Sequence, residues 1–254
     1  AALTSSAFIL AQASLMTLTL NSPLVQVQVA PPQAPPGGGG GFGGSGTVNQ
    51  GTTATEITED GTVTDTQYSS TGDDENALRV TGATVTLDGV TINKTAGATS
   101  NTENGDFYGM NAGFLATDGA TVTLTNSTVN TTAQNGNGVF SYGSGTTVNV
   151  SDTTITTTKD NSGGIQTTGG AAMNATTLTV NTAGNSSAAI RTDRGGGTVV
   201  VDKGTYTSTG YNSPAVYSTA NITVKNATLN AENSEALVIE GQNSITLVNT
   251  NVTG

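Results

Sequence analysis

The chain contains no cysteine, no histidine and no tryptophan. The absence of cysteine excludes disulfide bonds and thiolate metal ligands. The absence of histidine removes the commonest general base and the commonest metal ligand in proteins. Any catalytic or metal site must therefore be built from carboxylates, lysine or arginine.

Positive charge is also scarce in this sequence. Seven Lys and Arg residues stand against 18 Asp and Glu, which gives a formal net charge of −11 over 254 residues. Binding to nucleic acid requires clustered lysine and arginine side chains that neutralise phosphates. Nucleic acid is therefore not an expected partner.

The sequence is rich in small polar residues, with 34 glycines and many threonines, asparagines and serines. Threonine favours strands, whereas glycine and asparagine favour turns. Good helix formers do not recur at the helical period in any stretch. This composition indicates an all-β chain of short strands joined by tight turns.

Seven segments of the chain follow one pattern, seen first as Val85-x-Leu87-x-x-Val90-x-Ile92. The other six begin at Thr121, Thr147, Ala172, Thr198, Ile222 and Ile245. A weaker copy runs through Thr62 to Tyr68. The period of about 25 residues is typical of a solenoid and gives about eight coils between Thr52 and Gly254.

Each coil contains three strand-like pieces whose side chains alternate between core and solvent. The first piece ends near an apolar residue: Leu78, Leu115, Phe140, Ile165, Ile190, Val216 or Leu237. The second supplies an inward pair: Val85/Leu87, Val122/Leu124, Val148/Val150, Val199/Val201, Ile222/Val224 or Ile245/Leu247. The third points one residue inward: Ile92, Val129, Ile155, Val180, Tyr206, Leu229 or Val252.

This pattern predicts a parallel β-helix with three short strands per coil. Right-handed crossover is the strong default for parallel strands. A two-residue bend separates the second and third strands. Asn126, Asp152, Asn226 and Asn249 occupy similar places in these bends, so we expect a partial ladder of side-chain hydrogen bonds between coils.

Residues 1–30 form an apolar N-terminal segment. Ala11-Gln12-Ala13 has the small-x-small form of a signal-peptidase site, which favours a partial signal peptide over Ala1 to Ala13. The alternative is an extra strand that caps the solenoid or pairs with another subunit, since Leu18 to Val29 alternates as strands do. Polar residues interrupt the apolar run, so we expect no transmembrane helix.

Residues 31–46 are a Pro/Gly-rich linker, stiff in its proline part and flexible in its glycine part. Residues 47–254 form the predicted β-helix. The sequence ends within the third strand of a coil, and no polar cap follows Val252. Open solenoid edges are prone to aggregation, so we expect a truncated piece of a longer chain or a partner that covers this end.

Three segments, together with the coil pattern, resemble a known family: Asn104–Asn111, Asn137–Gly143 and Ile190–Gly197. The chain from about Gly41 onward is similar to the large right-handed β-helix proteins of anaerobic Gram-positive bacteria, which are secreted or wall-attached and adhesin-like. The resemblance implies a right-handed parallel β-helix and an extracellular or cell-surface location. It implies no catalytic residues.

Arg191, Asp193 and Arg194 are weak catalytic candidates. β-Helix polysaccharide lyases use Arg or Lys as a base and Asp residues to hold Ca²⁺ against a uronate, so this cluster can be expected to bind an acidic sugar. The other interpretation is a turn with a local ion pair. We favour the turn, because no Asp constellation repeats on neighbouring coils. The β-helix pectin hydrolases are disfavoured further, because their motifs include a histidine.

The run Asp73-Asp74-Glu75, together with Asp106 or Asp118 of later coils, is a weak Ca²⁺ candidate through its carboxylate oxygens. A solvated turn is the favoured interpretation. The insertion Ala96 to Asn111 is a second candidate region, since insertions in solenoids often gather on a binding face. Its Phe107 and Tyr108, with Tyr142, are candidates for stacking on a sugar ring, although packing against the solenoid wall explains them as well.

Outward threonines should stack on six consecutive coils, with a second column of Asn and Thr beside them. Such a grid is what ice-binding β-solenoids present, but threonine is also simply a good exposed strand residue. The first column consists of Thr91, Thr128, Thr154, Thr179, Thr205 and Thr228, and the second of Asn93, Asn130, Thr156, Asn181, Thr207 and Asn230.

The sequence thus favours a non-catalytic secreted or cell-surface β-helix that acts as an adhesin-like stalk. Its expected partners are extracellular glycans or host and cell-surface components. The alternatives are a lyase-like polysaccharide-active enzyme, an ice-binding solenoid, and a fibre subunit that associates through its N-terminal strand.

Overall fold

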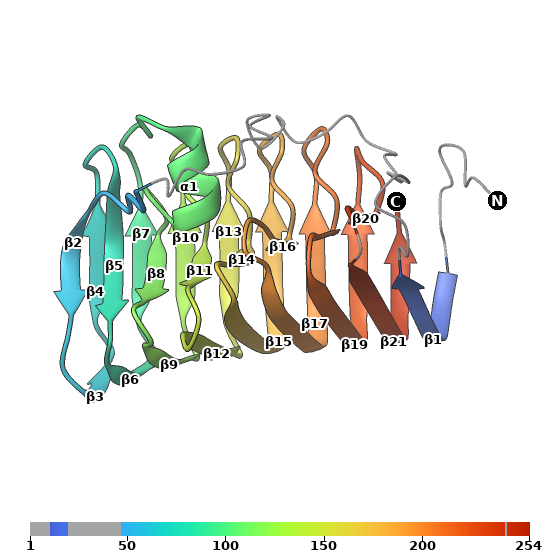
Figure 1. The fold of residues 1–254 in the computed structure, drawn as a ribbon, viewed down its shortest axis with the longest axis horizontal. Helices are drawn as coiled ribbons and strands as arrows, with labels where there is room; N and C mark the ends of the chain where they lie inside the picture. The colour runs from blue at the N-terminus through green and yellow to red at the C-terminus, as the bar shows by residue number, and fades with distance from the viewer. Residues whose placement is uncertain (1–10, 20–46, 242) are drawn as a thin grey trace.

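The computed structural model describes residues 11–19, 47–241 and 243–254. These residues form a parallel β-solenoid, an elongated rod of coils stacked side by side (Figure 1). Among them, the single helix α1 (Thr102–Tyr108) has seven residues and is too short to cross a membrane. The predicted all-β solenoid is confirmed.

One side of the rod, which we call face 1, is an eight-stranded parallel sheet with one strand from each coil. Equivalent residues stack directly, so Ile165 pairs with Ile190, one coil of 25 residues further on. The strands of face 1, in order, are β2 (Thr52–Ile57), β5 (Glu75–Thr81), β8 (Phe114–Thr117), β11 (Val139–Tyr142), β14 (Ile165–Thr168), β16 (Ile190–Thr192), β18 (Val216–Ser218) and β20 (Leu237–Ile239).

The other two sides carry the second and third strands of each coil. In the first four coils these strands are separate. Face 2 begins with β3 (Gly61–Thr64), β6 (Thr84–Asp88), β9 (Thr121–Thr125) and β12 (Thr147–Ser151). Face 3 begins with β4 (Gln67–Ser70), β7 (Thr91–Lys94), β10 (Thr128–Thr131) and β13 (Thr154–Thr157).

In the last four coils a single bent strand covers both faces, which differs from the expected three strands per coil. Backbone pairing continues around the bend: Thr176 pairs with Asp202 and Leu178 with Gly204. These long strands are β15 (Ala171–Thr182), β17 (Gly197–Ser208), β19 (Asn221–Ala231) and β21 (Ser244–Thr253).

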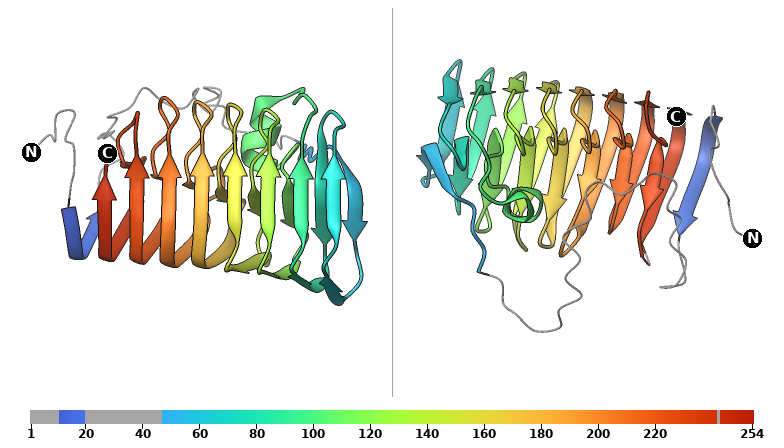
Figure 2. Two further views of the ribbon diagram at one scale, coloured as in Figure 1. Left: turned by 180° about the vertical axis from the view of Figure 1, so that it is seen from behind. Right: turned by 90° about the horizontal axis from the view of Figure 1, so that it is seen from above.

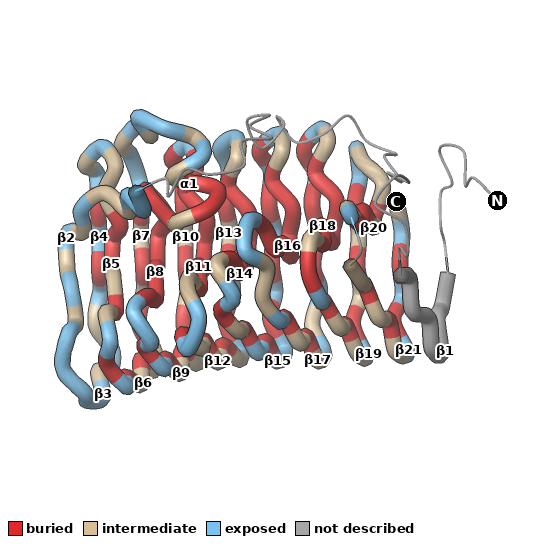
Figure 3. Tube along the Cα trace, viewed as in Figure 1, coloured by how far each residue is buried: buried red, intermediate tan, exposed pale blue. Residues whose placement is uncertain are grey.

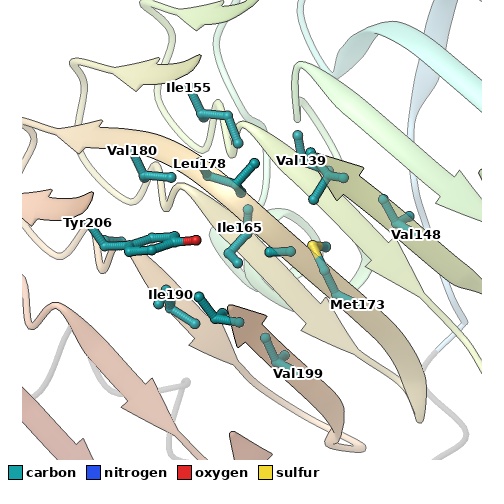
Figure 4. Close-up of a cluster of buried hydrophobic side chains, with 14 of the residues drawn as sticks. Val139, Val148, Ile155, Ile165, Met173, Leu178, Val180, Ile190, Val199 and Tyr206 are labelled. Carbon is teal, nitrogen blue, oxygen red and sulfur yellow. The ribbon is translucent and has the colours of Figure 1, made fainter. Parts of the chain in front are cut away.

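The core runs the length of the rod as stacked inward residues (Figure 3). Figure 4 shows neighbouring coils placing equivalent side chains over one another. The inward residues expected on the second and third strands are all buried. The stacked positions in Figure 4 are Val139, Ile165 and Ile190 on face 1, Val148, Met173 and Val199 on face 2, and Ile155, Val180 and Tyr206 on face 3.

Two residues of the expected first-strand column are misplaced. Leu78 stacks on Phe114, and Phe114 on Val139, so these two residues and not Leu115 and Phe140 continue the inward column. Leu115 and Phe140 lie on the outer side of face 1 and are nevertheless fully buried. They are covered because the insertion packs over them.

The bend between faces 2 and 3 requires one residue with positive φ in every coil. The residues there are Asp65, Gly89, Asn126, Asp152, Thr177, Lys203, Asn226 and Asn249. Glycine, asparagine and aspartate tolerate this left-handed region, whereas a β-branched residue such as threonine is a real outlier.

The expected ladder along this bend is confirmed in part. The Nδ2 of Asn249 donates to the Oδ1 of Asn226 at 2.9 Å, and the Nδ2 of Asn226 donates to the Oδ1 of Asp202 at 3.0 Å. The Nδ2 of Asn126 donates to the Oδ1 of Asp88 at 3.1 Å. The coils are therefore joined by side chains as well as by backbone.

The N-terminal strand β1 (Ala11–Thr19) pairs antiparallel with β21 and covers the edge of the last coil (Figure 2). Its register runs from Ala11 opposite Val252 to Thr19 opposite Ser244. A capping strand is therefore present, but it spans Ala11–Thr19 and shares only Leu18 and Thr19 with the strand expected from Leu18 to Val29. The rest of the 1–30 segment and the linker 31–46 lie outside the described residues.

Candidate functional site

The insertion between β7 and β8 folds into α1 and lies across the outer side of face 1 (Figures 1 and 2). Asn101 starts the helix, because its side-chain oxygen accepts a hydrogen bond from the backbone N–H of Asn104 at 3.1 Å. Gly109 ends it in the left-handed conformation with φ of 84°. Both signals are local, so the sequence of the insertion determines where the helix begins and ends.

Four consecutive carbonyls at the end of α1 each accept a hydrogen bond from a side chain of the solenoid. A helix leaves its last four carbonyls without a partner inside the helix, and here the sheet supplies those partners. The bonds are Asn137 Nδ2 to Gly105 O at 3.4 Å, Gln166 Nε2 to Asp106 O at 2.8 Å, Thr168 Oγ1 to Phe107 O at 2.5 Å, and Gln50 Nε2 to Tyr108 O at 3.1 Å.

Two glycines let the helix approach the sheet closely. A Cβ on Gly105 would lie 2.5 Å from the side-chain carbon of Asn135, and one on Gly109 would lie 2.6 Å from Leu115. No larger residue fits at either place without a shift of the helix or of the side chain that it would meet. The insertion is therefore fitted to this one position on face 1.

Asp106 extends from α1 into the contact with the sheet and is buried. Its Oδ1 accepts a hydrogen bond from the Nδ2 of Asn135 at 2.8 Å. Burial raises the pKa of Asp106 to about 7, with further contributions from Asp193 and Glu103, while Arg191 and the bond from Asn135 act in the opposite direction. The expected grouping of Asp106 with Asp73 and Asp74 is therefore replaced by a grouping with Asn135 and Arg191.

Arg191 lies on β16, next to Gln166 in the outer row of face 1. Its guanidinium forms an ion pair with Asp193 and lies 5.3 Å from the ring centroid of Tyr217 on the next coil. Burial lowers the pKa of Arg191, but Asp193 and Asp106 outweigh it and hold the pKa above its ordinary value. Arg191 and Asp193 are both almost fully buried, so the expected local ion pair is present and faces the protein rather than solvent.

The insertion brings the two sets of candidate residues together. The guanidinium of Arg194 lies 4.5 Å from the ring centroid of Phe107. The Phe107 and Tyr108 rings contact edge to face at 6.3 Å, and the Tyr108 and Tyr142 rings do so at 5.6 Å. We call Arg194, Phe107, Tyr108 and Tyr142 the aromatic strip.

Exposure differs along the aromatic strip. Phe107 is only 1% exposed, so it packs against the wall and its ring is covered by Arg194. Tyr108 and Tyr142 are half-buried, and Arg194 is exposed. Burial raises the pKa of Tyr142, as do Tyr108 and Asp118. Contact of Tyr108 and Tyr142 with a ligand stays a prediction.

The carboxylates of the acidic run bind backbone amides. Asp73 Oδ1 accepts from Ala98 N at 2.8 Å, and Asp74 Oδ1 accepts from Ser100 N at 2.7 Å. Glu75 Oε1 accepts from Ser70 and from Gly72 N. Within residues 47–241 and 243–254, no three carboxylates converge in a way that could hold a metal ion. Calcium binding at this run stays a prediction.

The threonine column is confirmed as a register. Thr91, Thr128 and Thr154 are directly paired, and the Asn/Thr column runs beside them. The pairing continues through Thr179, Thr205 and Thr228. Face 3 therefore presents two adjacent columns of uncharged polar side chains.

Sequence reasoning missed the residues that hold the insertion in place. Gln50, Asn137, Gln166 and Thr168 are ordinary polar residues in the sequence, and only the docked helix gives them a role. The signal that was available is the pair of adjacent apolar residues Phe114-Leu115 and Val139-Phe140, which makes both sides of these strands apolar and so requires a cover on the outer side. Comparison of the chain with protein-family models, curated proteins and solved structures finds no match.

Proposed function

We propose that the chain is the rod of a non-catalytic secreted or cell-surface protein that attaches to extracellular glycans or to other surface components. The observation that carries this proposal is the state of the best acid–base pair. Arg191 and Asp193 are buried against each other and against Tyr217, so neither offers a free group to a substrate. A base must reach the proton that it removes.

The shape of the molecule also supports an adhesive role. Stacked coils make a stiff rod, and face 3 offers an unbroken polar surface along it.

A glycan array probed with the full chain, with and without Ca²⁺, tests the proposal. Binding without cleavage, established by product analysis of every hit, is the expected result. Cleavage of a bound polysaccharide would instead establish the lyase-like enzyme. If no glycan binds, the glycan-binding part of the proposal fails.

Ice binding is the second candidate, because the threonine column is in register on six consecutive coils. Its test is thermal hysteresis of the full chain. Thr154→Lys and Thr179→Lys should abolish the effect, whereas Thr86→Lys on face 2 should not. No hysteresis in the unaltered chain would dismiss this candidate.

A further inference from the structure

The three arginines of the chain differ in what their guanidinium groups contact. Arg79 donates from Nη2 to the carbonyls of Gln50, Gly51 and Thr52 and from Nε to Asn76. Arg191 is paired with Asp193. Arg194 is exposed, and within the described part of the chain its guanidinium makes neither an ion pair nor a hydrogen bond. Arg194 therefore has donors available for a ligand.

The guanidinium of Arg194 is also held in place. It lies over the ring of Phe107 at 4.5 Å, and α1 fixes that ring through the bond from Thr168 to the Phe107 carbonyl. Stacking orients the planar group, so less rotamer freedom is lost when it binds a partner. A guanidinium matches a carboxylate with two parallel hydrogen bonds.

The neighbouring charges leave this arginine unneutralised. The Asp193 carboxylate pairs with Arg191 and accepts a hydrogen bond from the backbone N–H of Arg194, not from its guanidinium. The chain as a whole has a charge of −11 and would repel an acidic polymer, so attraction must come from a local group. Arg194 supplies such a group on the exposed surface beside α1.

The rest of the aromatic strip suits the apolar face of a ring. Tyr108 and Tyr142 are half-buried, so each has an exposed part, and they meet edge to face at 5.6 Å. Amphipathic rings of this kind offer both an apolar surface and a hydroxyl group. Asp118, which follows β8, contributes to the raised pKa of Tyr142, so an anionic group is disfavoured near Tyr142 and favoured near Arg194.

We propose that Arg194, Tyr108 and Tyr142 form a binding site for an acidic saccharide. Arg194 holds the carboxylate of the sugar, and the tyrosines pack against its ring. The site rests on the proposed glycan-binding function and adds to it the class of ligand and the place where the ligand binds.

Calorimetric titration of the full chain tests this site with three probes: tetragalacturonate, its methyl ester and the neutral cellotetraose. We expect tetragalacturonate to bind most tightly. We expect Arg194→Gln to weaken this binding by about tenfold or more, as loss of a charged hydrogen-bonding pair does. Arg194→Lys keeps the positive charge but loses the planar guanidinium that makes two parallel hydrogen bonds, so it should retain part of the affinity. Tyr142→Leu should also weaken binding.

Lys203→Gln is the matched control, because it removes one exposed positive charge at the bend between faces 2 and 3. It should leave the affinity unchanged, and an unaltered unfolding midpoint should show that each variant is folded. The site is overturned if the ester binds as well as the acid, or if Arg194→Gln binds like the unaltered chain. Binding of neutral glycans alone would overturn the site and leave glycan binding intact, whereas no binding to any glycan would remove both.

Discussion

Asn135 and Asp106 join two segments that are 29 residues apart, through a hydrogen bond of 2.8 Å from the amide Nδ2 to the carboxyl Oδ1. Asn135 precedes β11, and Asp106 belongs to the insertion helix α1. Both are buried, so the bond forms where an ionised carboxylate is costly. The contact between α1 and the solenoid therefore depends on the protonation of Asp106.

Asp106 should make stability fall as pH rises. Its pKa is about 7 in the folded protein against an ordinary value of 3.8, so between these values the folded state holds a proton that the unfolded chain has lost. The free energy of unfolding then decreases by up to about 1.4 kcal/mol per pH unit from this group. Asp106→Asn keeps the acceptor and removes the charge, so its stability relative to the unaltered chain should rise from pH 5 to pH 8 in urea unfolding.

The control for this prediction is Glu103→Gln on the same helix, because Glu103 is exposed and loses the same charge. Glu103 makes the smallest of the contributions that raise the pKa of Asp106, so the fall of stability with rising pH should persist in this variant. Equal profiles for Asp106→Asn and Glu103→Gln would contradict a protonated Asp106.

Two adjacent buried threonines on β14 should respond in opposite ways to valine. Thr168 donates to the carbonyl of Phe107, and Thr168→Val should cost about 1–3 kcal/mol because that carbonyl loses its partner. The hydroxyl of Thr167 has no hydrogen-bond partner among the residues that the structure describes, so Thr167→Val should be neutral or stabilising. Chemical denaturation of both variants measures the difference, and equal losses would refute the role of Thr168 in holding α1.

Thr177 stands at the bend position that requires positive φ, where most other coils have Gly, Asn or Asp. Thr177→Asn should therefore stabilise the protein by about 0.5–1 kcal/mol, since asparagine tolerates this conformation better than a β-branched residue. Its neighbour Thr176 is equally exposed but has no positive φ, so Thr176→Asn should bring no gain. Thermal unfolding compares the two, and a loss of stability in Thr177→Asn would contradict the strain assigned to this residue.

Deletion of residues 1–19 should promote self-association. β1 covers the edge of β21, and its removal exposes a row of unpaired backbone groups that can pair with another chain. Sedimentation velocity over a range of concentrations should show association of the deleted chain. Deletion of residues 1–10 alone leaves β1 and should have no such effect. Identical behaviour of the two deletions would argue against the cap.

The fold was predictable because its information is local and repeated. Seven coils repeat the alternation of Val85, Leu87 and Ile92, and stacking places the copies in register. The docking of α1 was not predictable in this way, because Gln166 lies 60 residues from Asp106 and Thr168 lies 61 from Phe107. No periodic pattern encodes such a contact.

The error at Leu115 and Phe140 has the same origin. The strand from Phe114 to Thr117 is buried on both sides, so alternation alone does not say which side faces the core. The outer side is apolar only because α1 covers it. In the sequence Phe107, Tyr108 and Tyr142 stood in one candidate group and Arg194 in another, and their contact in the structure depends on that same cover.

In most solenoids each coil touches only the next one, so a pulling force can peel the chain one coil at a time. The insertion changes this behaviour, because α1 binds Gln50 ahead of the first coil, Thr168 on the fifth, and the Arg194 that follows the sixth strand of face 1. Tension on the C-terminus would first separate β21 from β1 and unwind the coils of β20 and β18. It would then meet the contacts of α1, which tie the preceding six coils together. A molecule bound to a surface through these six coils would stay attached under load while its last two coils extend.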